Sequence, residues 1–131
     1  MIDQGYKREI EATVETVAKL REAGVRMVVG GDYGISIAPH GTYAKDLEYF
    51  VEYFDMRPLE ALMCATNYGG LAFDPAGSVG TLTEGSFADL VIVDGQPDQD
   101  IRILQAHDRL TVMKGGVTVS YTHLTLPTKN E

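Results

Sequence analysis

The chain has 131 residues, enough for one ordinary domain but too few for a complete eight-fold β/α barrel, which needs about 250. Hydrophobic residues make up 44% of it and charged residues 23%, a composition typical of folded rather than disordered proteins. Nineteen acidic and eleven basic residues give a net charge of −8. Nucleic-acid surfaces and sites for anionic membranes need clustered Lys and Arg, so this charge argues against both.

The cysteine content and the N-terminal residues indicate the cellular compartment of the protein. A single cysteine excludes an internal disulfide and fits a reducing compartment. No apolar run approaches the roughly 20 residues of a membrane span, and the first residues lack the basic and apolar regions of a signal peptide. The sequence therefore predicts a soluble protein of the cytoplasm.

The first part of the chain has the pattern of an α/β unit. Apolar residues spaced by three and four predict an amphipathic helix over 7–23, and Gly24 follows where a left-handed cap is expected. The β-branched run 25–29, closed by two glycines, predicts a buried strand. A helix, a capping glycine and a buried strand form the repeating unit of a parallel sheet.

Two more helices are expected before the residue pattern changes to one typical of β-structure. An apolar stripe predicts a helix over 42–54, and Pro58 stands at the first position of the next, with Glu60 in its first turn. The pair Gly69-Gly70 is expected to end that helix.

Beyond Asp74 the pattern becomes that of β-structure. Residues 88–95 predict a strand closed by an Asp-Gly turn. Residues 110–113 and 117–119, separated by Lys-Gly-Gly, predict a hairpin. The chain therefore divides near Asp74 into an α/β part and an all-β part.

Asp32 is the first candidate for chemistry. It follows the predicted strand across two glycines, at the carboxyl end where parallel α/β sheets place functional groups. A carboxylate there can bind a divalent metal or take a proton from a metal-bound water. The local pattern alone favours the alternative, an aspartate that only forms a turn.

The other reactive side chains have weaker patterns. His40 lies in a Pro-His-Gly loop that could face a substrate, although a lone loop histidine is more often only solvated. His107 and His123 have no metal-ligand neighbour at the usual spacing. Cys64 lies in an apolar helix and is expected to pack in the core.

Taken in order, these segments resemble the C-terminal part of the amidohydrolase superfamily, on its imidazolonepropionase-like and Xaa-Pro-dipeptidase-like side. The features that carry the resemblance are Ala23-Gly24-Val25 before Gly30-Gly31-Asp32, Pro39-His40-Gly41 with Asp46-Leu47-Glu48, Pro58-Leu59-Glu60-Ala61-Leu62 with Ala65-Thr66, Gly80-Thr81-Leu82-Thr83-Glu84-Gly85-Ser86-Phe87-Ala88-Asp89-Leu90, and Met113-Lys114-Gly115-Gly116. Each feature is weak by itself, but the order and spacing are specific over residues 7–119.

The resemblance implies a metal-dependent hydrolase on a (β/α)8 barrel, with a small composite β-sandwich. Residues 1–74 then correspond to the last segment of the barrel and residues 75–119 to part of the sandwich. Asp32 matches the aspartate that binds the metal, expected to be zinc, and moves the proton of the attacking water. From its Pro-His-Gly loop, His40 is the candidate residue to lie near the substrate. An assembly of identical chains is compatible with the resemblance.

Some features depart from the family. The other metal ligands, a His-x-His pair among them, would precede residue 1, and Gly31 stands where the family usually has threonine. Residues 120–131 depart altogether and look like translated adapter sequence, so we expect a non-native tail; the alternative is an ordinary disordered terminus.

The leading hypothesis is a C-terminal fragment of a hydrolase that cleaves C–N bonds in an amide, a cyclic amide or an X-Pro peptide. The alternative is a self-standing, non-catalytic acidic α/β interaction module. A phosphoesterase or deaminase on the same scaffold is not separable from the first, because fold does not fix substrate. With its barrel strand unpaired and its apolar helix faces uncovered, the chain alone is expected to aggregate or stay molten and to have no hydrolase activity.

Overall fold

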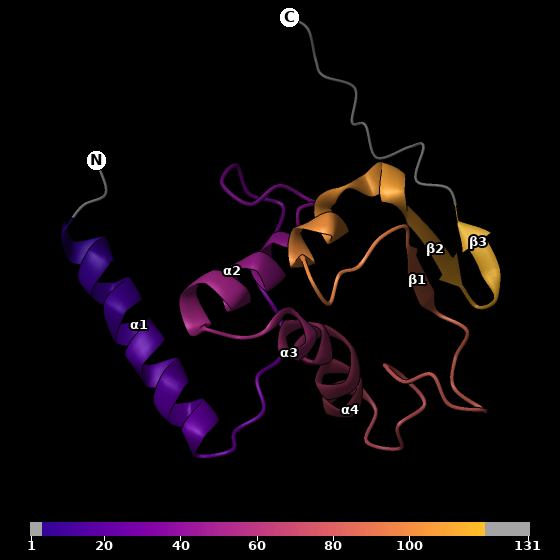
Figure 1. Ribbon diagram of the computed structural model, residues 1–131, viewed down its shortest axis with the longest axis horizontal. Coiled ribbons are helices and arrows are strands. Elements are labelled where there is room, and N and C mark those ends of the chain that lie inside the picture. The colour runs from indigo at the N-terminus through magenta and orange to yellow at the C-terminus, as the bar shows by residue number, and fades with distance from the viewer. Residues whose placement is uncertain (1–3, 120–131) are drawn as a thin grey trace, which may run out of the picture.

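The computed structural model describes residues 4–119, with helices toward one end and a small sheet at the other (Figure 1). Helix α1 (Gln4–Glu22) confirms the helix predicted over 7–23 and begins three residues earlier. Gly24 follows the helix as the expected cap, with a φ of 78°. The amide of Gly24 donates to the carbonyl of Arg21 at 2.9 Å and closes the left-handed cap.

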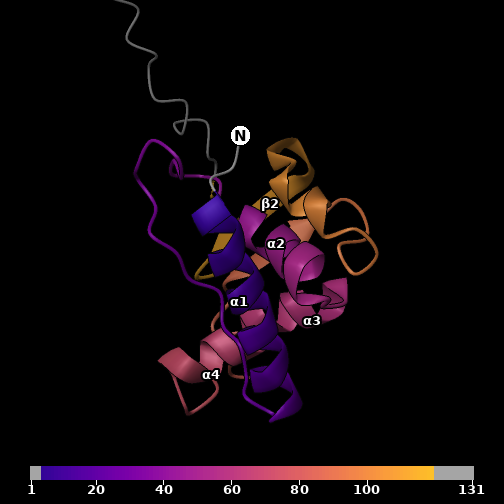
Figure 2. The same ribbon diagram turned by 90° about the vertical axis from the view of Figure 1, so that its left-hand side faces the viewer.

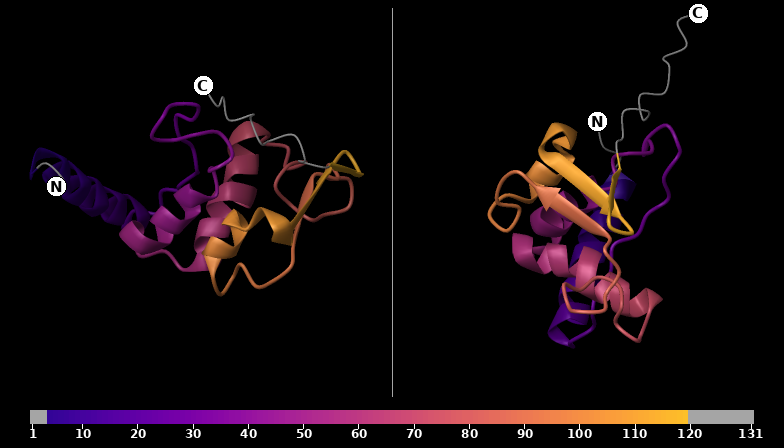
Figure 3. Two further views of the ribbon diagram at one scale, coloured as in Figure 1. Left: turned by 90° about the horizontal axis from the view of Figure 1, so that it is seen from above. Right: turned by 90° about the vertical axis from the view of Figure 1, so that its right-hand side faces the viewer.

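Helix α1 has few contacts with the rest of the molecule and projects from it (Figure 3). Of residues 5–22 in this helix only Val17 is buried, whereas Ile10 is 43% and Leu20 38% exposed. At its C-terminal end, the guanidinium of Arg21 donates to the carbonyl of Phe54 at the end of the next helix. The expected uncovered apolar face is therefore present on α1.

The prediction of a strand over residues 25–29 is wrong. The extended segment 25–33 leads from the end of α1 to the next loop (Figure 2), and the described residues show no main-chain hydrogen bond from residues 26 to 33. Val25 and Val28 are 47% and 45% exposed. The β-branched run has the right propensity, but a strand needs a paired neighbour, and no strand of the described residues pairs with it.

The second helix, α2 (Lys45–Phe54), lies within the range predicted over 42–54 and packs on a small core. Its end at Asp55 is a left-handed turn with φ 52°. The core is built around Leu47, Ala61 and Ile101, and the partly buried residues against it are Val29, Phe50, Val51, Leu62 and Leu104. Ile101 begins the short 3-10 helix η2 (Ile101–Gln105), so this core joins the helical part to the segment between two strands.

Helix α3 (Pro58–Met63) begins at the predicted proline, but the predicted end at Gly69-Gly70 is wrong. A π-helical turn, η1 (Cys64–Tyr68), leads directly into α4 (Gly69–Phe73). Gly70 allows a close approach between two stretches of main chain. A Cβ on Gly70 would lie 2.2 Å from the carbonyl oxygen of Val79.

Three antiparallel strands follow, in the order β1 (Leu90–Val93), β2 (Leu110–Lys114) and β3 (Val117–Val119). They confirm the strand and hairpin predicted after Asp74. Between β1 and β2 the chain also forms η3 (His107–Arg109).

The turn between β2 and β3 is tied to the residues before β1. The amide of Gly115 donates to the Asp89 carboxylate at 2.7 Å, and the ammonium of Lys114 also binds that carboxylate. The amide of Gly116 donates to the carbonyl of Ala88 at 2.9 Å. Asp89 therefore serves the fold of the sheet rather than a reaction.

We expect this tie to weaken in acid. The Lys114 side chain and then the Gly115 amide hold the pKa of Asp89 below its ordinary value. A depressed folded-state pKa contributes stability that is present above the unfolded pKa and lost as the pH falls through the folded one. Hydrogen exchange of the Gly115 amide, corrected for the intrinsic rate, should lose protection below about pH 4, near the ordinary aspartate pKa. In the variant Asp89→Asn this pH dependence should vanish; if it persists there, another carboxylate is responsible.

Three further expectations from the sequence concern the membrane, the tail and the domain division. The part of the chain that the structure describes contains no helix long and apolar enough to cross a membrane. The tail at 120–131 and His123 lie outside the described residues. The division into domains near Asp74 stays a prediction.

Candidate functional site

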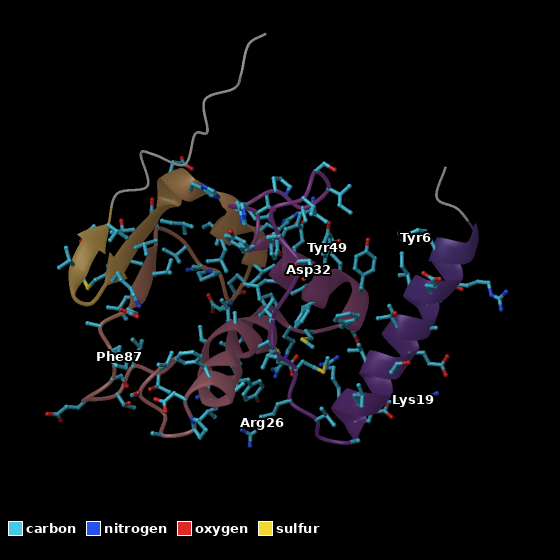
Figure 4. The ribbon with its side chains drawn as sticks, turned by 180° about the vertical axis from the view of Figure 1, so that it is seen from behind. Tyr6, Lys19, Arg26, Asp32, Tyr49 and Phe87 are labelled. Carbon is cyan, nitrogen blue, oxygen red and sulfur yellow. The ribbon has the colours of Figure 1, made fainter. Side chains whose placement is uncertain are left out.

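Asp32 stands at the end of the extended segment, where the chain turns into the loop before α2 (Figure 4). Its side chain is exposed. Among residues 4–119 its carboxylate has no hydrogen bond or ion pair. The structure therefore places Asp32 at a loop, free to bind a group from outside this segment.

The loop that follows Asp32, residues 34–43, is closed by its own main-chain bonds. The amide of Gly34 donates to the carbonyl of Ala38 at 2.8 Å, and the amide of Ala38 donates to the carbonyl of Ile35 at 3.0 Å. Gly34 has a φ of 95°, a conformation that favours glycine. The loop is thus a compact turn with a defined path.

His40 folds back over the start of this loop. Its Nδ1 lies 2.7 Å from the hydroxyl of Tyr43. A Cβ on Gly34 would lie 2.6 Å from its Nε2, so the other edge of the imidazole rests on the Gly34 backbone. No described contact joins His40 to Asp32.

An aromatic contact links this arrangement to the residue next to Asp32. The rings of Tyr33 and Tyr43 meet edge to face, with centroids 4.5 Å apart and an interplanar angle of 72°. We call His40, Tyr43 and Tyr33 the aromatic clasp. It closes the loop from both ends, because Tyr33 and Gly34 stand at its start and His40 and Tyr43 at its end.

The Tyr33 hydroxyl is buried and faces the first turn of α2. It has no hydrogen-bond partner of good geometry among the described residues. Burial, followed by the neighbouring Asp46 carboxylate, raises the pKa of Tyr33 to about 12. The phenol is therefore neutral at any physiological pH. Sequence reasoning did not find this group, because its members come together only through the fold of the loop.

The described residues do not by themselves fit a metal centre. No group of three or more His, Cys, Asp or Glu side chains lies close enough to hold an ion in the described range. Asp32 supplies one hard oxygen ligand, whereas protein metal sites use several. Any metal bound at Asp32 needs further ligands from outside these residues.

Cys64 is confirmed as a buried side chain of the helical core. Its Sγ lies 3.9 Å from the Sδ of Met56, and burial raises the pKa of the thiol. A protonated, buried thiol is a poor nucleophile and a poor metal ligand.

Known proteins resemble most of this chain. The model of a family described as the amidohydrolase family matches residues 7–119. Ochratoxinase of Aspergillus niger is 33% identical over 110 residues, which cover 82% of this chain and 23% of that protein. Its crystal structure superposes with a TM-score of 0.72 over 82% of this chain and 24% of that one.

Two other crystal structures extend the comparison. A protein of Bifidobacterium longum assigned as a prolidase is 30% identical, with a TM-score of 0.71 over 81% of this chain and 26% of its own. An amidohydrolase with 22% identity and a TM-score of 0.67, over 81% of this chain and 25% of that one, shares the fold. The chain spans about a quarter of the length of the relatives it matches.

Proposed function

This chain belongs to the amidohydrolase family, and from that premise we propose that it is the C-terminal segment of a metal-dependent hydrolase that cleaves carbon–nitrogen bonds. The family resemblance seen in its motifs is confirmed. The observation that carries the proposal is the match over residues 7–119, together with 33% identity to a hydrolase more than four times as long as the matched stretch. The candidate substrates are an amide, a cyclic amide or an X-Pro peptide, and the relative assigned as a prolidase supports the last.

The proposed fold of the complete protein explains the unpaired segment of this one. We infer that residues 25–32 form the last strand of a (β/α)8 barrel once neighbouring strands are present, so that residues 1–74 complete the barrel. Residues 75–119 then belong to a composite β-sandwich. The extended, unpaired main chain at 26–33 and the exposed Val91 and Ile92 of β1 support this proposal.

In this scheme Asp32 is the functional carboxylate of the segment. We propose that it binds a divalent metal, expected to be zinc, whose other ligands come from the preceding part of the protein. A bound metal lowers the pKa of its water toward neutrality. With the metal in place, the Asp32 carboxylate would accept a proton from the attacking water and would pass it to the leaving amine. Its exposure and lack of other partners support this role, because nothing in the segment competes for the carboxylate.

The remaining proposals concern the surroundings of the complete protein. His40 is proposed to lie near the substrate, in the loop beside Asp32. The partners are a small-molecule substrate and other copies of the same chain, with no nucleic acid or membrane. The acidic balance of −8 supports the exclusion of nucleic acid. The location is proposed to be the cytoplasm.

The proposal is tested by comparing residues 1–119 with the complete protein. Both are assayed with added zinc on a simple amide, a cyclic amide and an X-Pro dipeptide. We expect hydrolysis of one of these classes by the complete protein, and none above the metal-only control by residues 1–119. Turnover by the short chain would refute its fragment status, and a complete protein inactive on all three classes would refute the function.

A further inference from the structure

One ring nitrogen of His40 is engaged within this chain, which bears on what this histidine can do. Nδ1 lies 2.7 Å from the Tyr43 hydroxyl, and the Nε2 edge lies against the Gly34 backbone. A general acid, a general base or a metal ligand needs a free nitrogen aimed at its target. In His40 the Nδ1 is held by Tyr43, and the Nε2, which lies against Gly34, has no hydrogen-bond partner among the described residues.

The contacts of His40 lead instead to the main chain at Asp32. Tyr43, held by His40, packs edge to face on Tyr33 at 4.5 Å. Tyr33 is the residue directly after Asp32, and its ring is partly buried with its hydroxyl fully buried. The Asp32 side chain has no contact of its own within the described residues, so its direction is set by the path of the main chain that the neighbouring Tyr33 anchors.

From these contacts we propose that His40 is a positioning residue. It acts through Tyr43 and Tyr33, as the aromatic clasp, to hold the Asp32 carboxylate in place for the proton transfer. The inference rests on the proposed function of Asp32. It predicts a loss of rate rather than of substrate affinity, because misplacing a reacting group by about 1 Å can cost about 100-fold in rate.

Two substitutions in the complete protein distinguish the contribution of Nδ1 of His40 from that of Nε2. In His40→Asn the amide sits near the position of Nδ1 and can still bond Tyr43, whereas in His40→Gln it sits near Nε2. We expect His40→Asn to keep kcat within about threefold. His40→Gln and Tyr43→Phe should each lower kcat by about ten- to 100-fold with little change in KM. The exposed His107, changed to Gln, is the matched control and should leave kcat and KM unchanged.

The kinetic results can also overturn the proposal. If His40→Gln is active and His40→Asn is not, Nε2 acts on the substrate. A rise in KM with kcat unchanged would make His40 a substrate contact. If His40→Asn and His40→Gln lose rate equally, or if neither loses any, the bond to Tyr43 positions nothing. Melting temperatures of all variants must stay within a few degrees of the wild type for kcat to be compared.

A second readout does not depend on activity. Nitrogen-15 NMR of the imidazole rings should show His40 as the Nε2–H tautomer at neutral pH, because Nδ1 accepts the Tyr43 hydroxyl proton. In Tyr43→Phe this signal should move toward tautomer averaging, while that of His107 stays. An unchanged His40 signal would refute the clasp. If the complete protein hydrolyses no amide, the proposed function fails, and the nitrogen spectrum alone decides whether the clasp exists.

Discussion

Replacing Asp32 by asparagine in the complete protein is expected to lower kcat by about 10³-fold. Proton transfer by a positioned side chain contributes typically about 10²- to 10⁴-fold, and asparagine is of the same size but cannot accept the proton. The substitution should also lower the metal content after dialysis, measured by elemental analysis, because an amide is a weaker ligand than a carboxylate. The rate is measured at saturating metal, so that the two effects are separated.

Asp55→Asn is the matched control for this experiment. Asp55 is exposed and stands in the left-handed region with φ 52°, where asparagine is also accommodated. Its kcat and metal content should be those of the wild type. A kcat for Asp32→Asn within tenfold of the wild type would contradict the role proposed for Asp32, whatever the metal content.

The elements that depend on local pattern could be predicted from the sequence. Helix α1 follows from residues spaced by three and four, and its end follows from Gly24, because both signals lie within one stretch of chain. The β2–β3 hairpin follows for the same reason, from two short apolar runs around Gly115-Gly116. Packing elsewhere in the molecule does not alter these choices.

Features that depend on distant residues could not be predicted. The run at 25–29 has the composition of a strand, but pairing needs a neighbouring strand, and none of the described residues supplies one. Gly70 has the appearance of a helix end, whereas its role comes from Val79, nine residues later. Asp32 could be named as a candidate site residue from the sequence, because it follows a β-branched run. The aromatic clasp is not, since the folded loop alone brings Tyr33 and His40 to Tyr43.

Replacing Gly80 by alanine is expected to be the most destabilising of the glycine substitutions. A Cβ at this position would lie 2.2 Å from the carbonyl oxygen of Thr66. The Cβ is fixed by the main chain and the oxygen belongs to it, so neither can move away by a side-chain rotation. Overpacking costs about 1–3 kcal/mol, and the left-handed φ of 78° adds about 1–2 kcal/mol for a residue with a Cβ. We therefore expect a loss of about 2–5 kcal/mol, measured as a lower denaturant midpoint of the complete protein.

Gly77→Ala separates the two contributions. Gly77 has nearly the same φ, 81°, but a Cβ there meets nothing within 4 Å, so only the conformational cost of about 1–2 kcal/mol should appear. Gly80 packs against the turn η1 that follows α3, and its reciprocal partner is Gly70 of α4. The difference between the two variants therefore measures how closely the loop after Asp74 is packed on the helices before it. Equal losses would show that this close contact contributes nothing, and that Gly80 is needed for its turn alone.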